Sequence, residues 1–139
     1  MNKFILTFTL SAILFVMASF CQYKPDESLL VGSWTVEKFV KGGNSIDVTP
    51  LNISLQCSVE GDLGQLSGRT RKDFFSGIYE VKSRKSIKFS NIIRTNYDTD
   101  DAAKEFLDSF QLVSKFRVAE DDLLLLNDEQ SIYITLRKK

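Results

Sequence analysis

The sequence predicts a mainly β fold, a small antiparallel β-sandwich or partly open barrel with one α-helix at about residues 100–113 packed on it. Short runs of alternating apolar and polar residues recur along the chain, and this is the period of a half-buried strand. Glycine-rich and polar turns separate these runs. Near residue 99 the apolar residues change to a helical spacing. Together these observations favour one β-rich domain carrying one substantial helix.

Residues 1–20 are expected to be a signal peptide. Lys3 provides a positive start, an apolar run follows over residues 4–17, and two small residues come next. This is the layout of a secretory signal. The apolar run is shorter than the ~20 residues that a membrane-spanning helix needs. The sequence therefore predicts an exported protein rather than one held by a membrane-spanning anchor.

Cys21 stands where the lipidated cysteine of a bacterial lipoprotein would stand, at the end of the lipobox-like sequence MASFC. Phe20 departs from that pattern, because a small residue normally precedes the cysteine. We expect lipid attachment at Cys21, with ordinary cleavage and a soluble secreted protein as the alternative. The polar residues 21–28 are predicted to be a tether, followed by one domain over residues 29–139.

The strands are expected in two groups on either side of the helix. They cover about residues 30–40, 51–59, 65–70, 74–81, 87–89, 115–119, 123–126 and 131–137. Residues 51–59 show the cleanest alternation, residues 91–98 are expected to be an irregular connection, and the last three strands are expected to form an antiparallel meander. The predicted helix places Ala103, Phe106, Leu107, Phe110 and Val113 on one face.

Cys57 falls on the apolar face of the strand over residues 51–59. We expect a buried side chain that acts as a small hydrophobe. A reactive thiol is the alternative, although no neighbouring residue in the sequence would lower its pKa. If Cys21 carries no lipid, a bridge between Cys21 and Cys57 is conceivable.

The composition excludes several kinds of chemistry. The chain has no histidine, so it lacks the Ser-His and Cys-His nucleophile pairs and the common zinc sites. The acidic clusters at 98–101 and 120–122 do not match the spacing of a calcium-binding loop. Basic and acidic residues both number 18, which provides no large field to attract nucleic acid. We expect no cofactor, no metal, no nucleic-acid partner and no catalytic activity.

Two turns are rich in basic residues. Arg69, Arg71 and Lys72 cluster in one, and they are the candidate patch for an anion or a partner, with an ordinary solvated loop as the alternative. The second is the hairpin tip over residues 82–88, which contains three lysines and Arg84. Basic residues there are expected to discourage pairing between edge strands.

Motifs between Leu30 and Leu136 carry a family resemblance. They are Leu30-x-Gly32-x-Trp34, Ser67-Gly68, Phe75-x-Gly77-x-Tyr79, Ile87-x-Phe89 with Thr95, Glu105-Phe106-Leu107 and Phe116-x-Val118. In this order they resemble the META/HslJ-like domain family, small β-rich modules of bacterial envelope proteins. The two cysteines of that family fall on Lys72 and Thr99 here, which implies the loss of a disulfide that typically contributes ~2–4 kcal/mol.

The resemblance implies a non-catalytic accessory or binding protein, tethered to the envelope or secreted, with a role in envelope stress tolerance. Its expected partners are an unidentified protein or envelope component, and the membrane if Cys21 carries lipid. The first alternative is a lipocalin-like carrier of small hydrophobic ligands, suggested by Gly32-Ser33-Trp34 and the many aromatic residues. The second is a secreted protease inhibitor that presents residues 69–75.

Overall fold

A computed structural model describes residues 27–94 and 101–139 of the chain. Short 3-10 helices are η1 (Glu27–Leu30) and η2 (Thr49–Leu51), and the α-helix is α2 (Asp101–Phe110). The strands are β1 (Gly32–Lys41), β2 (Asn44–Ile46), β3 (Ser54–Glu60), β4 (Leu63–Arg69), β5 (Phe74–Val81), β6 (Ile87–Arg94), β7 (Lys115–Ala119), β8 (Asp122–Leu126) and β9 (Ile132–Lys138). The signal peptide and Cys21 lie outside the described residues, as does Thr99.

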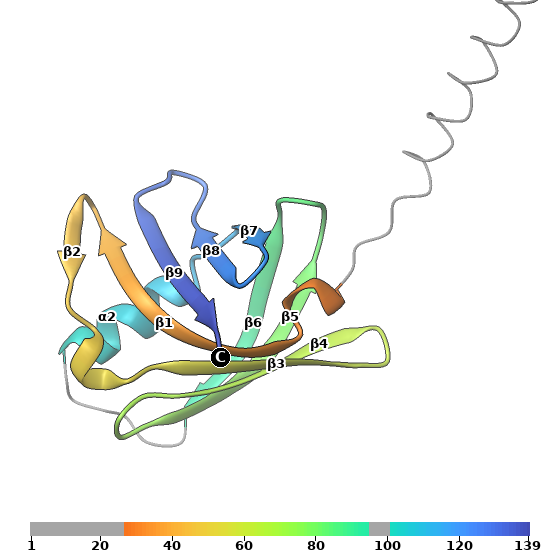
Figure 1. The fold of residues 1–139 in the computed structure, drawn as a ribbon, viewed down its shortest axis with the longest axis horizontal. Helices are drawn as coiled ribbons and strands as arrows, with labels where there is room; N and C mark the ends of the chain where they lie inside the picture. Colours follow the sequence, from red (N-terminus) through yellow and green to blue (C-terminus); the bar gives the residue numbers. More distant parts are fainter. Residues whose placement is uncertain (1–26, 95–100) are drawn as a thin grey trace, which may run out of the picture.

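The strands form one antiparallel sheet in the order β6-β5-β4-β3-β1-β9-β8-β7, and β2 pairs with β1. Hairpins connect neighbours at both ends of this order, from β3 to β6 and from β7 to β9. The long strand β1 joins the two groups, because its first residues pair with β3 while most of its length pairs with β9. The fold is thus a curled antiparallel sheet, and Figure 1 shows it as a half-barrel.

The two ends of the sheet meet at one point. Ser86 and Lys115 form an isolated antiparallel bridge next to the starts of β6 and β7. The Phe116 N–H donates to the Lys85 carbonyl at 2.9 Å, and the Ile87 N–H donates to the Ser114 carbonyl at 3.0 Å. These bonds bring the β5–β6 hairpin tip against the start of β7, so the two edges of the curled sheet touch at this end.

Two local features let the sheet curl. The register shifts between Val36 and Lys38 in β1, and again at Gly77 in β5, and such bulges increase the bend and twist of a strand. A glycine also permits a close approach in β4, because a Cβ on Gly68 would lie 2.3 Å from Cζ of Phe75. The Phe75 ring therefore packs directly on the backbone of the neighbouring strand.

The helix α2 fills the concave side of the sheet. Phe106 and Phe110 are fully buried, and their rings contact aromatic rings from strands that are far apart in the sheet order. The ring centroids of Phe106 and Phe39 are 5.7 Å apart, and those of Phe110 and Phe89 are 4.4 Å apart. One continuous hydrophobic core thus joins the helix to both groups of strands.

The predicted architecture is confirmed, with differences in detail. The helix ends at Phe110 rather than at residue 113, although Val113 is still buried. The strand expected from residue 51 begins at Ser54, because residues 49–51 form η2 and Asn52 follows with a positive φ. The irregular connection expected from residue 91 was wrong over residues 91–94, which extend β6 along β5. The folded part includes residues 27 and 28, which the sequence placed in the tether.

Candidate functional site: a basic groove

A groove open to solvent lies between the β5–β6 hairpin tip and the strands β7, β8 and β9. We call it the basic groove, and its volume is about 570 Å³. It is lined by Arg84, Lys85, Lys115, Phe116, Arg117, Val118, Leu124, Leu126, Gln130 and Tyr133. Four of these residues are cationic and none is acidic. Half-buried Leu124, Leu126 and Tyr133 add an apolar surface between the cations.

The hairpin tip that carries Arg84 and Lys85 has a defined conformation. The Ser86 carbonyl accepts from the Lys82 N–H at 2.8 Å and closes the turn. Inside the turn, the Ser83 hydroxyl oxygen accepts hydrogen bonds from the backbone N–H groups of Lys85 and Ser86. The serine hydroxyl thus accepts hydrogen bonds from two backbone N–H groups within the turn. The two cationic side chains therefore extend from a hydrogen-bonded turn.

The opposite wall of the basic groove is fixed by the β8–β9 turn. The side-chain oxygen of buried Asn127 accepts from the N–H groups of Ser131 at 2.9 Å and Ile132 at 3.0 Å. Next to it, the Ser114 hydroxyl donates to Asp128 at 2.7 Å, and the Ser114 N–H donates to the Leu126 carbonyl. These bonds join β7 and β8 to the turn, so both walls are held before a ligand arrives.

Acidic residues flank the basic groove at both ends of the β7–β8–β9 face without lining it. Glu120, Asp121 and Asp122 occupy the β7–β8 turn, and Asp128 and Glu129 lie in the β8–β9 turn at the end where the hairpin meets β7. Asp122 lies 3.6 Å from Arg137. In the described part of the chain, no carboxylate pairs with the side chains of Lys85, Lys115 or Arg117. The basic groove is therefore suited to a ligand that brings a negative charge of its own.

The patch predicted from the sequence lies elsewhere, on the β4–β5 turn. Arg69 ends β4, and its guanidinium lies 5.7 Å from the centre of the exposed Phe74 ring. Arg71 and Lys72 are exposed in the turn itself. A groove of about 190 Å³ contains Arg69 and Phe74 together with Lys139 from the C-terminus, but neither of the other two predicted residues. That these three residues together bind an anion or a partner stays a prediction.

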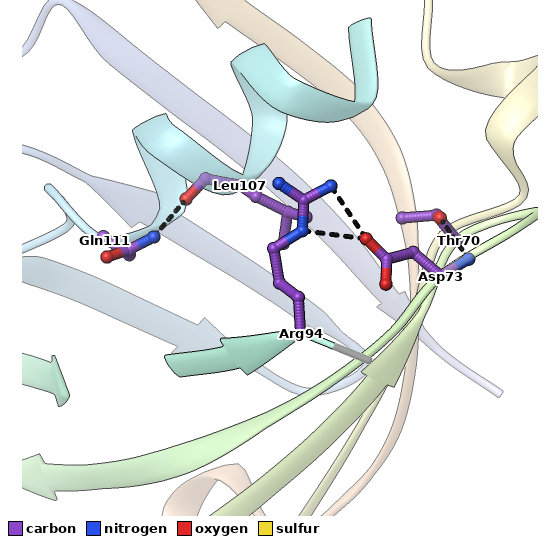
Figure 2. A network of polar contacts seen from close by, with 5 residues as sticks. All are labelled: Thr70, Asp73, Arg94, Leu107 and Gln111. Carbon is purple, nitrogen blue, oxygen red and sulfur yellow. Dashed lines mark hydrogen bonds and ion pairs between the residues drawn. The ribbon is translucent and has the colours of Figure 1, made fainter. Parts of the chain in front are cut away.

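A buried ion pair fastens this turn to the end of β6 (Figure 2). The Arg94 Nε donates to Asp73 Oδ2 at 2.8 Å, and Nη2 lies 2.8 Å from the same oxygen. The Asp73 side chain is fully buried, and that of Arg94 is 14% exposed. The Asp73 N–H also donates to the Thr70 hydroxyl, and the Thr70 N–H donates to the Asp73 carbonyl. These contacts assign the Asp73 carboxylate a structural role.

Cys57 is buried and free, as expected, and it pairs with Leu66 inside the β3–β4 ladder. Burial raises the pKa of its thiol from 9.0 to about 12. A thiol in this state is a poor nucleophile at neutral pH, because the thiolate is the reactive species. The buried position therefore favours the packing interpretation over the reactive-thiol alternative.

The raised pKa predicts how Cys57 responds to reagents and to pH. In a Cys21→Ser chain at pH 8, we expect Cys57 to react with a thiol-specific chromogenic disulfide only after denaturation. Because the unfolded thiol ionises above 9.0 and the folded thiol near 12, its contribution to stability is present below pH 9 and is lost as the pH rises through this window. Rapid reaction of the folded chain would contradict the assignment.

Within the described residues, no group of three or more histidine, cysteine or acidic side chains is placed to bind a metal ion. None of the helices in those residues has the length and apolar character needed to cross a membrane.

Comparison with known proteins gives a likeness of fold. No family model matches the chain, and no curated protein matches it. The structure is similar to the crystal structure of a DUF4847 family protein from Bacteroides vulgatus ATCC 8482, with a TM-score of 0.61 and 12% sequence identity. The match covers 80% of this chain and 94% of that chain. At this identity the likeness establishes a shared fold.

Proposed function

We propose that this chain is an exported, non-catalytic binding protein of META/HslJ-like type that binds an anionic ligand in the basic groove. The observation that carries the proposal is the set of four cations around an apolar surface, with no acidic residue in the lining. The signal-like residues 1–20 support export, and Cys21 supports a lipid anchor in the cell envelope. Its partner is then a molecule of the envelope or the space outside the cell.

The arrangement of the basic groove indicates the kind of ligand. Arg117 can present two parallel N–H donors to a phosphate or carboxylate, while Lys85 and Lys115 act as point charges. Leu124, Leu126 and Tyr133 can cover an aliphatic or aromatic group attached to that anion. The ligand class is therefore an amphiphile with one anionic end, and the fixed walls reduce the entropy lost on binding.

The carrier alternative places the ligand inside the sheet, where α2 already lies. Phe106, Leu107 and Phe110 are fully buried on that concave side. A ligand of carrier size needs a cavity of several hundred Å³ lined by apolar side chains. Binding inside would therefore require α2 to leave its position, whereas the basic groove needs no such change.

The binding proposal is tested with 1-naphthyl phosphate, which combines a phosphate with an apolar ring and is followed by its fluorescence. We expect saturable binding to the exported protein. The Lys85→Glu/Arg117→Glu double variant removes two charge-assisted contacts, worth about 1.5–3 kcal/mol each, so affinity should fall at least tenfold. Both residues are exposed, so the fold should be unaffected.

Lys38→Glu/Lys104→Glu is the matched control, because it changes the net charge equally at two exposed residues outside the basic groove. It should bind the probe within about twofold of the wild type. If both double variants lost affinity for the probe equally, the loss would be due to the change in net charge and not to the basic groove. An absence of saturable binding to the wild type would overturn the proposal.

A further inference from the structure

We infer that the basic groove faces the membrane and that its occupant is the phosphate headgroup of an anionic phospholipid. This inference rests on the proposed function, and it identifies the source of the anion. The described part of the chain begins with η1, which lies beside the β5–β6 hairpin that forms one wall of the basic groove (Figure 1).

Hydrogen bonds hold η1 against this hairpin. Glu27 Oε2 accepts from the Val81 N–H at 2.7 Å, and the Glu27 carbonyl accepts from the Tyr79 hydroxyl at 2.8 Å. Val81 is the last residue of β5 and immediately precedes the turn that carries Arg84 and Lys85. The first described residue is thus fixed next to the basic hairpin tip.

The tether is too short to let the domain turn freely at the membrane. Six peptide units separate Cys21 from Glu27, and they span about 20 Å when fully extended. With lipid on Cys21, Glu27 therefore stays within about 20 Å of the bilayer surface. The hairpin bonded to Glu27 can then reach that surface, where attraction between basic residues and anionic lipids acts within about 10 Å at ordinary ionic strength.

Basic residues outnumber acidic ones at the end of the domain that carries the hairpin tip, where Asp128 and Glu129 of the β8–β9 turn also lie. Lys82, Arg84, Lys85 and Lys88 lie on the hairpin, and Lys115 and Arg117 lie across the basic groove from it. Lys82 is paired with Glu80 at 2.8 Å. The acidic turn over residues 120–122 lies at the far end of β7 and β8 and would point away from a negative surface. A lipid anchor and a basic surface together provide the two signals that stable membrane attachment requires.

Vesicle binding by the Cys21→Ser chain tests this inference, because that chain keeps the basic groove and has no site for lipid. The exported form is used after its mass has shown that the signal peptide is removed. In 0.1 M NaCl we expect it to sediment with vesicles of phosphatidylglycerol and phosphatidylcholine in equal parts, and not with pure phosphatidylcholine. Binding should fall at least tenfold in Lys85→Glu/Arg117→Glu or in 0.5 M NaCl, and little in Lys38→Glu/Lys104→Glu.

Three outcomes would overturn the inference. If the chain binds 1-naphthyl phosphate but not the anionic vesicles, the proposed function stands and the membrane orientation fails. If both double variants lose vesicle binding equally, the attraction is not located at the basic groove. Failure with both the soluble probe and the vesicles would remove the proposed function together with this inference.

Discussion

Phe110→Ala is expected to destabilise the protein by about 3–5 kcal/mol, the cost of removing a buried phenylalanine from a close-packed core. Phe110 is fully buried, and its ring lies near the rings of Phe75, Phe89 and Phe106. Truncation would leave a cavity between α2 and the sheet that those rings cannot fill without moving. Urea denaturation followed by circular dichroism measures the change in the free energy of unfolding.

Leu112→Ala is the matched control, since Leu112 lies two residues further along and is 61% exposed. Its effect should stay within about 0.5 kcal/mol, as is usual for surface positions. A loss below about 1 kcal/mol in Phe110→Ala would show that α2 does not pack into the curl of the sheet. The half-barrel would then need another source for its core.

Asp73→Ala is expected to cost about 3–5 kcal/mol, because it removes the buried Asp73 carboxylate from the largely buried Arg94 guanidinium. The same substitution removes the oxygen that joins the β4–β5 turn to the end of β6. Folding free energy from urea denaturation is again the measurement. Arg94→Met should be similarly costly, because it leaves the fully buried Asp73 carboxylate without this partner.

The double variant Asp73→Leu/Arg94→Met distinguishes a buried pair from an exposed one. Replacing both charges by apolar groups of similar size should recover most of the loss, since neither charge is then buried alone. Glu80→Gln provides the comparison with an exposed ion pair, because it breaks the contact between Glu80 of β5 and Lys82. The Lys82 ammonium beside Glu80 lowers the pKa of that exposed carboxyl, and its removal should shift the denaturation midpoint little. Additive losses in the double variant would contradict the coupling of Asp73 and Arg94.

The sequence alone was sufficient for the main architecture. Alternation over residues 54–60 and 132–138 is visible because side chains on a half-buried strand change face at every residue. The helical face with Phe106 and Phe110 is visible because apolar residues on one face of a helix recur every three or four residues. The extension of β6 to Arg94 was missed, because those residues include no regular alternation and Asn91 has a positive φ.

The candidate site was harder to predict because it is assembled from distant segments. Arg84 and Lys85 were recognised as basic residues of a hairpin tip, but their function was assigned to edge protection. Lys115 and Arg117 lie about thirty residues further along, and the Ser86–Lys115 bridge with its neighbouring backbone hydrogen bonds brings the two pairs together. An isolated bridge between distant segments produces no repeating apolar pattern in the sequence from which it could be predicted. The charge of Lys115 and Arg117, next to the apolar run in β8, was the available signal.

The patch at Arg69, Arg71 and Lys72 was easier to find because its residues are adjacent in sequence. Arg69 lines the groove beside Phe74, whereas Arg71 and Lys72 lie exposed in the turn. The inhibitor hypothesis, which uses residues 69–75, remains a prediction. It competes directly with the basic groove for any anionic or protein partner.

Chemical-shift mapping of the isotope-labelled, exported protein during titration with 1-naphthyl phosphate tests the central claim most directly. We predict that the backbone amides that shift are those of residues 84–85, 115–118, 124–126 and 130–133. Shifts concentrated at residues 69–74 would assign binding to the β4–β5 turn instead. Shifts concentrated on α2 and the concave face would indicate an interior site, and either result would contradict the assignment of the basic groove.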